Sequence, residues 1–298
     1  MIDLILAPIA VALVILFMHA YLGLHVLARG VIFVDLAFAQ IAALGATGGL
    51  LVGLEPGTPG SWFCAFGATL IGALLFSASR LEDSPIDQEA IIGITFVVAS
   101  AAVLLLASLS AEGAEHVSET LTGTLIWAGW REVVILSVVY TVIGAFHWVF
   151  RRQLLTASFQ PHGTAKLRTW DFLFYVSLGL VISLSVAIAG VLLVFSSLVI
   201  PGVIAFFFTT NFSRALVLAW STGAAAVVFG ITGSFVLDIT TGPFLVCSFG
   251  AALVIAAILK WTLRIRTGIE FELPDALRGS AAPRDPASSL TPSQADGD

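Results

Sequence analysis

The chain has 298 residues, of which 58% are hydrophobic and only 11% are charged, against about 25% charged residues in an ordinary soluble domain. Its mean hydropathy of +1.03 and its recurring apolar runs of about 20 residues exclude a water-soluble fold. Ten of the charged residues fall between Arg264 and Asp298, so the rest of the chain is nearly uncharged. Its scattered Lys and Arg residues exclude a nucleic-acid-binding surface, which needs a concentrated basic patch.

The apolar runs predict an all-α polytopic integral membrane protein, because a backbone in hydrocarbon must satisfy its own hydrogen bonds. We expect nine transmembrane helices, over residues 4–27, 33–53, 61–79, 90–109, 132–150, 171–189, 191–208, 214–236 and 244–263. The sixth and seventh runs meet at Gly190 with almost no loop. If that pair partly re-enters the membrane, eight helices cross it.

Basic residues favour the cytoplasmic side of short loops. An extracytoplasmic N-terminus and a cytoplasmic C-terminus place every Lys and Arg except Arg131 inside, so we predict this orientation. From about Thr267 onward the composition changes to Pro, Ser, Asp and Gly, which cannot bury enough apolar area to offset the entropy of ordering. The predicted organisation is a membrane domain over 1–265 and a disordered cytoplasmic tail over 266–298.

Two polar connections are candidates for contacts with partners. The cytoplasmic stretch 151–171 is basic, which indicates either a docking surface or the basic residues that ordinarily flank membrane helices. The external stretch 111–131 carries carboxylates and an imidazole, groups that suit divalent cations. It either faces a metal-delivering partner or is a solvated loop. Its candidate residues are Glu112, Glu115, His116 and Glu119.

Polar groups within or beside the spans are candidates for a transport pathway. An unpaired polar group in the membrane is costly, so its presence there indicates a function. Asp35, Gln40 and Asp238 are such groups. Each carboxylate also has a local explanation, Asp35 as a first-turn or capping residue and Asp238 as a helix boundary before Pro243. We expect His19 and His25 to be interior histidines with their hydrogen bonds satisfied.

Four motifs then occur in order along residues 10–263. They are Leu22-Gly23 through Arg29 to Asp35 and Gly45, Glu89 to Gly93-Ile94, the run from Gly190 through Pro201 to Ala205, and Leu237-Asp238 through Gly242-Pro243. The ordered set resembles the permease subunits of bacterial zinc, manganese and iron uptake ABC transporters. The resemblance implies a type II importer-like permease of the bacterial inner membrane.

Similarity to that family further implies three kinds of partner: cytoplasmic P-loop ATPase subunits, an extracytoplasmic metal-binding protein, and a second permease chain, in a homodimer by preference. ATP hydrolysis would then occur on a partner chain, so this chain is expected not to be an enzyme. A divalent metal, zinc or manganese, would be the transported substrate. No cofactor is expected on the chain itself.

The same resemblance assigns a metal pathway to Asp35, Gln40 and Asp238, and coupling helices to the segment 154–167. The residues expected to contact the ATPase are Gln153, Leu154, Leu155, Gln160, Lys166 and Arg168. Two features depart from the family pattern. Gln40 stands where the family has a histidine, and one added residue puts it about 140° from Asp35 on a regular helix. The coupling loop is also about one helical turn shorter.

Two other functions compete with this hypothesis. An ATP-independent carrier or channel would need coupling carboxylates in mid-span and usually shows paired repeats, and the sequence shows neither feature. A non-transporting membrane scaffold would use the polar loop and the tail to recruit cytoplasmic proteins. A neighbouring gene for a P-loop ATPase would favour the permease over both.

Overall fold

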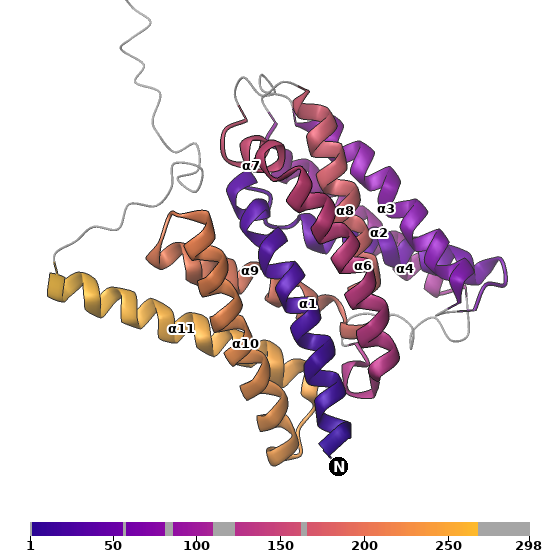
Figure 1. The fold of residues 1–298 in the computed structure, drawn as a ribbon. Helices are drawn as coiled ribbons and strands as arrows, with labels where there is room; N and C mark the ends of the chain where they lie inside the picture. Colours follow the sequence, from indigo (N-terminus) through magenta and orange to yellow (C-terminus); the bar gives the residue numbers. More distant parts are fainter. Residues whose placement is uncertain (1, 56–57, 81–85, 110–122, 162–165, 268–298) are drawn as a thin grey trace, which may run out of the picture.

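A computed structural model describes residues 2–55, 58–80, 86–109, 123–161 and 166–267, and within these ranges every regular element is helical. The predicted tail over 266–298 lies outside the described residues except for its first two positions. The elements, shown in Figure 1, are α1 (Ile2–Arg29), α2 (Val34–Leu51), α3 (Pro59–Ser79), α4 (Gln88–Ala107), η1 (Leu125–Trp127), α6 (Trp130–Val149), α7 (Arg151–Phe159), α8 (Leu167–Ala189), α9 (Val191–Phe208), α10 (Phe212–Leu237) and α11 (Thr241–Thr267).

Nine helices in the described part of the chain are long and apolar enough to span a membrane. They coincide with the nine predicted runs to within a few residues, so the polytopic all-α fold is confirmed. Two helix starts show ordinary side-chain capping. Pro59 begins α3 directly after Thr58, whose side chain accepts a hydrogen bond from the Ser61 amide, and Asn211 caps α10 in the same way.

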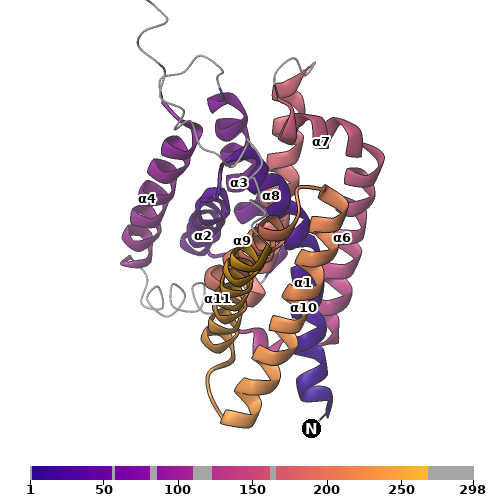
Figure 2. The same ribbon diagram turned by 90° about the vertical axis from the view of Figure 1, so that its left-hand side faces the viewer.

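The helices form two groups that meet along the centre of the molecule. Helix α2 packs against α3, α4 and α8, and α1 packs against α6, α9 and α10, with α11 lying on α9 and α10. Figure 1 shows α2, α3 and α4 on one side of α1 and the α9–α11 group on the other, and Figure 2 shows α2, α3 and α4 on the left with α1, α6 and α10 on the right. Helices α2 and α9 are the most buried spans, whereas α4, α6 and α11 expose most of their apolar surface.

Helix α7 marks one end of the bundle, which we call the α7 end (Figure 1). The C-terminal ends of α1 and α3 meet α7 there through hydrogen bonds from Arg29 and Arg80, and Asp171 at the start of α8 pairs with both arginines. The start of α10 joins them, because the Phe212 ring packs on Phe159 of α7. Basic residues gather at this end. They include Arg29, Arg80, Arg151, Arg152, Lys166, Arg168 and Arg214.

The sharp connection between α8 and α9 is made by Gly190 alone, with φ of 77°. Gly123, also at positive φ, approaches it so closely that a Cβ there would lie 2.2 Å from the Ala189 carbonyl carbon. The amide of Thr124 donates to the Ile188 carbonyl oxygen at 3.0 Å. The segment before η1 therefore braces the junction, and α8 and α9 are two separate helices of spanning length.

Gly23 allows the backbones of α1 and α9 to approach closely, because a Cβ at that position would lie only 1.9 Å from the carbonyl oxygen of Leu198. We predict that Gly23→Ala lowers the free energy of unfolding by about 1–3 kcal/mol, the range for overpacked cores. Gly144 on α6 is the matched control, since a Cβ there meets nothing within 4 Å among the described atoms. Thermal unfolding in detergent measures both variants. Equal stability of the two would show that α9 accommodates the methyl group.

Candidate functional site

Asp35 lies in the first turn of α2 and is 1% exposed. Neither of its carboxylate oxygens has a hydrogen-bond partner among the described residues. The local explanation is thus confirmed as to the first turn but fails as to capping, because a capping carboxylate accepts hydrogen bonds from backbone amides. A buried carboxylate without a partner is costly, and within a membrane domain such a group indicates a functional position.

Gln40 is also buried on α2, five positions after Asp35. Helix α2 is a regular α-helix over this stretch, so the two side chains leave it about 140° apart. The two residues thus belong to one helix but not to one face of it. A single ion cannot be held by both from this helix, and each would act at its own point along a pathway.

Glu89 on α4 supplies the cap that Asp35 does not. Its Oε1 accepts a hydrogen bond from the amide of Phe33, the residue just before α2, at 3.0 Å. Its Oε2 is buried without a partner in the described part of the structure. The N-terminus of α2 thus has two carboxylates near it, one from α2 and one from α4, where the positive end of the helix dipole favours negative charge. The acidic residue of the Glu89 to Ile94 motif therefore has a local structural task.

Asp238 lies away from Asp35, Gln40 and Glu89, at the other end of the bundle. It ends α10 in the left-handed conformation, with φ of 53°, and is exposed. Its predicted role as a helix boundary is confirmed by this geometry. The structure does not bring Asp238 together with Asp35 or Gln40. The external candidates Glu112, Glu115, His116 and Glu119 lie outside the described residues.

The predicted ATPase-contacting residues divide by exposure. Gln153, Gln160, Lys166 and Arg168 are exposed and Leu155 is half-buried, whereas Leu154 is fully buried against the membrane helices. Leu154 is therefore not on the surface that a partner could contact. The short helix of this connection, α7, begins at Arg151 and ends at Phe159, so it starts before the predicted segment 154–167. Residues 162–165 of that segment lie outside the described residues.

A buried ionic network at the α7 end was not predicted. Asp171 of α8 is 1% exposed and forms ion pairs with Arg29, at the end of α1, and with Arg80, directly after α3. Nη1 of Arg80 lies 3.0 Å from Oδ1 and 3.1 Å from Oδ2 of Asp171. The Arg29 guanidinium also stacks on the Phe174 ring, 4.0 Å from its centroid. The only signal in the sequence is one acidic residue among basic span ends.

The network extends into α7. Nε of Arg29 donates to Oγ of Ser158 at 3.0 Å, and Nη1 of Arg80 donates to the carbonyl oxygen of Ala157 at 3.2 Å. Nδ1 of His25 lies 2.9 Å from the same Ser158 Oγ. Four elements, α1, α3, α7 and α8, thus meet in one set of polar contacts.

The interior histidines are only partly satisfied. Nδ1 of His19 lies 2.8 Å from the Ile15 carbonyl oxygen, but Nε2 of His19 and Nε2 of His25 have no partner among the described residues. Both histidines are interior, as expected, but the expectation that their hydrogen bonds are satisfied is wrong for Nε2. A third buried histidine, His147, lies 2.8 Å from Ser177 Oγ and 3.2 Å from Tyr21 Oη. It ties α6 to α8 and α1.

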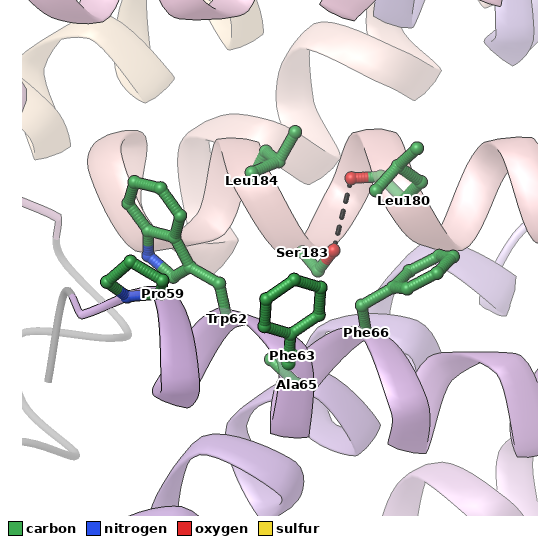
Figure 3. Close-up of a pocket in the computed structure, with 8 residues that line it drawn as sticks. All are labelled: Pro59, Trp62, Phe63, Ala65, Phe66, Leu180, Ser183 and Leu184. Carbon is green, nitrogen blue, oxygen red and sulfur yellow. Dashed lines mark hydrogen bonds between the residues drawn. The ribbon is translucent and has the colours of Figure 1, made fainter. Parts of the chain in front are cut away.

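These groups do not form a preformed metal site. Among the described residues, no three His, Cys, Asp or Glu side chains are placed to hold an ion together. A cavity of about 210 Å³ lies between the start of α3 and the later turns of α8. Figure 3 shows its lining, where the rings of Trp62, Phe63 and Phe66 face Leu180 and Leu184. None of its eight lining residues carries a charge, and the hydroxyl of Ser183 donates to the Leu180 carbonyl oxygen.

Comparisons with known proteins show which family the chain resembles. The sequence profile of the ABC 3 transport family matches residues 1–260. The chelated iron transport system membrane protein YfeC of Yersinia pestis is 27% identical over 232 residues, 76% of each chain. The manganese transport system membrane protein MntB of Synechocystis is 25% identical over 203 residues, 67% of this chain and 64% of that one.

A solved structure shares the fold. PsaBC from Streptococcus pneumoniae, in complex with a Fab, superposes with a TM-score of 0.71 at 20% identity, covering 87% of this chain and 94% of that one. The match of the family profile covers the first eight spans and ends at residue 260, within the ninth. The chain therefore belongs to the ABC 3 transport family, as a multi-pass membrane permease subunit.

Proposed function

We propose that this chain is the membrane permease of an ATP-driven importer for a divalent transition metal. The observation that carries the proposal is the buried carboxylate of Asp35, which has no hydrogen-bond partner in the described structure. A passing cation would supply the charge that this group lacks, so the protein would hold the ion transiently.

The donor types favour particular ions. Carboxylate and amide oxygens, as offered by Asp35 and Gln40, suit manganese better than the imidazole and thiolate ligands that select zinc. Of the two predicted substrates we therefore place manganese before zinc. Iron(II) joins them, because relatives are named for chelated iron and for manganese transport.

The orientation follows from the basic residues. They gather at the α7 end, so the positive-inside rule makes that end cytoplasmic and the N-terminus extracytoplasmic, in a bacterial inner membrane. The exposed residues Gln153, Gln160, Lys166 and Arg168 then face the cytoplasm, where P-loop ATPase subunits would dock. Asp238 would lie on the side from which an extracytoplasmic metal-binding protein delivers the ion.

A second copy of the chain completes the transporter in this proposal. The pathway would run between the two permease chains, with the chemistry of ATP confined to the ATPase partners. Coupling carboxylates in mid-span, which an ion-coupled carrier needs, are absent from the described spans, where the charged residues lie at or near the helix ends. This arrangement supports an ATP-driven permease over a carrier.

The test is to purify the tagged chain from its native host in mild detergent and to identify by mass spectrometry what accompanies it. We expect a P-loop ATPase in stoichiometric amount, whose ATP hydrolysis in proteoliposomes rises when the metal-binding protein and Mn²⁺ are added. A chain that arrives alone at several salt concentrations would contradict the proposal and favour a carrier or a scaffold.

A further inference from the structure

Helix α7 is fastened to the bundle along one face. Its buried residues Leu154, Ala157 and Ser158 recur at the spacing of a single helical face. The opposite face, with Arg152 and Thr156, is exposed, as are Arg151 and Gln153 in the first turn. A force that a cytoplasmic partner applies to α7 can therefore pass into the membrane helices through the buried face, as well as through the backbone junction with α6 at Phe150.

The polar contacts on that face lie at the C-terminal turn of α7. Ser158 Oγ accepts from Nε of Arg29, and the Ala157 carbonyl oxygen accepts from Nη1 of Arg80. Both arginines also pair with Asp171. These three charged side chains come from the ends of α1, α3 and α8, so one cluster connects α7 to three spanning helices.

The cluster has the properties of a stiff connection. The side chains of Arg29 and Asp171 are 0% and 1% exposed, so water does not compete for their hydrogen bonds. The planar guanidinium donates in fixed directions, and charge-assisted bonds are shorter and stronger than neutral ones. Two arginines face one carboxylate, and the carbonyl end of α7 provides the remaining negative potential. Moving α7 alone would break the bonds from Arg29 to Ser158 and from Arg80 to the Ala157 carbonyl oxygen, and would leave both arginines with Asp171 as their charged partner.

Two of the connected helices lead to the candidate pathway. Helices α3 and α8 both pack against α2, which carries Asp35. A displacement of the cluster would therefore shift the walls around that carboxylate. Contiguous packed helices and ion-pair networks are the physical means by which distant sites are coupled.

We propose that Arg29, Arg80 and Asp171 are positioning residues of a joint that makes α7 move as one body with the ends of α1, α3 and α8. The inference rests on the proposed function, because the joint would transmit movements of the ATPase to the metal pathway. The network holds α7 whether or not an ATPase binds, so its mechanical role can be tested separately.

Arg80→Ala is the informative variant. Arg80 is the only partly exposed member of the three, at 17%, and its removal leaves Arg29 and Asp171 as a matched pair, so the fold survives. Arg214→Ala is the control, because Arg214 is an exposed arginine in the first turn of α10 at the same end of the bundle. Arg80→Lys restores the charge without the planar fork, and we expect it to rescue only in part.

The first measurement is hydrogen exchange of the α7 amides in the full-length chain in lipid nanodiscs. We expect exchange in Arg80→Ala to be about tenfold faster than in the wild type, with no change in Arg214→Ala. The second is the amount of Mn²⁺ transported per ATP hydrolysed in proteoliposomes with the ATPase that copurifies. We expect that ratio to fall about tenfold in Arg80→Ala, with the same amount of ATPase bound and the same apparent Tm.

Each outcome separates the two proposals. Unchanged exchange in Arg80→Ala would show that the network does not anchor α7, whatever the chain transports. Faster exchange with an unchanged Mn²⁺ to ATP ratio would overturn the joint as a transmitting element. A wild-type chain that binds no ATPase would contradict the proposed function, and it would also overturn transmission, while the exchange experiment would still report on the anchor.

Discussion

Replacing Asp35 by Asn is expected to abolish metal uptake while leaving the protein at least as stable as the wild type. The carboxylate is buried, and neither oxygen has a hydrogen-bond partner in the described structure, so its charge is a cost to the folded state. Asn keeps the size of the side chain and removes that charge. If a passing cation uses the carboxylate directly, uptake falls at least about 100-fold, the upper end of the losses found when groups that only orient a metal ligand are removed.

A loss of uptake combined with unchanged or increased stability is what a functional residue predicts. A structural carboxylate would lose stability and activity together, whereas a functional one is retained at a cost to stability. Asp35→Ala is expected to abolish uptake in the same way without preventing assembly. Uptake of radioactive ⁵⁴Mn²⁺ into cells or proteoliposomes, and thermal unfolding in detergent, measure the two quantities.

The matched control is Asp87→Asn. Asp87 precedes α4 at the same end of the bundle, is exposed, and makes no capping hydrogen bond through its side chain. Its replacement is expected to leave both uptake and stability unchanged. Wild-type uptake in Asp35→Asn would remove this residue from the pathway and would leave Gln40 as the remaining candidate on α2.

The spans were predictable because hydropathy acts locally. Residues 33–53 became α2 over Val34–Leu51, and 191–208 became α9 with the same bounds. A single run of apolar residues in a membrane can satisfy its backbone hydrogen bonds by itself only as an α-helix. Its conformation can therefore be predicted without knowledge of the neighbouring helices. The short α7 was predicted as part of a connection, but its buried face was not, because Leu154 and Ala157 are too few to show a period.

The ionic network could not be read from the sequence. Asp171 lies 142 residues from Arg29 and 91 from Arg80, so no local pattern connects them. The positive-inside rule accounts for an arginine at the end of a span whether or not it has a partner. For the same reason Asp35 and Asp238 looked alike in the sequence, each a carboxylate beside a helix boundary. Only the fold separates the buried group without a partner from the exposed one that ends α10.

The largest effect on stability is expected from Asp171→Ala. That change leaves the fully buried Arg29 guanidinium without its carboxylate, and breaking a buried pair by removing one partner costs about 3–5 kcal/mol. Arg80 loses the same partner but is partly exposed, so water relieves part of its cost. Thermal unfolding in detergent and the yield of folded protein measure the loss. Full stability in Asp171→Ala would show that the charge of Arg29 is satisfied elsewhere.

A second variant separates the charge from the packing. Replacing both buried partners, as Arg29→Met with Asp171→Leu, removes the unpaired charge and keeps apolar volume around Phe174, so much of the lost stability should return. The double variant still lacks the bonds from Arg29 to Ser158 and from Asp171 to Arg80. Recovered stability with faster hydrogen exchange of the α7 amides would then show that the charged side chains are retained to position α7 rather than to stabilise the bundle. A double variant as unstable as Asp171→Ala alone would instead make the network a requirement of folding.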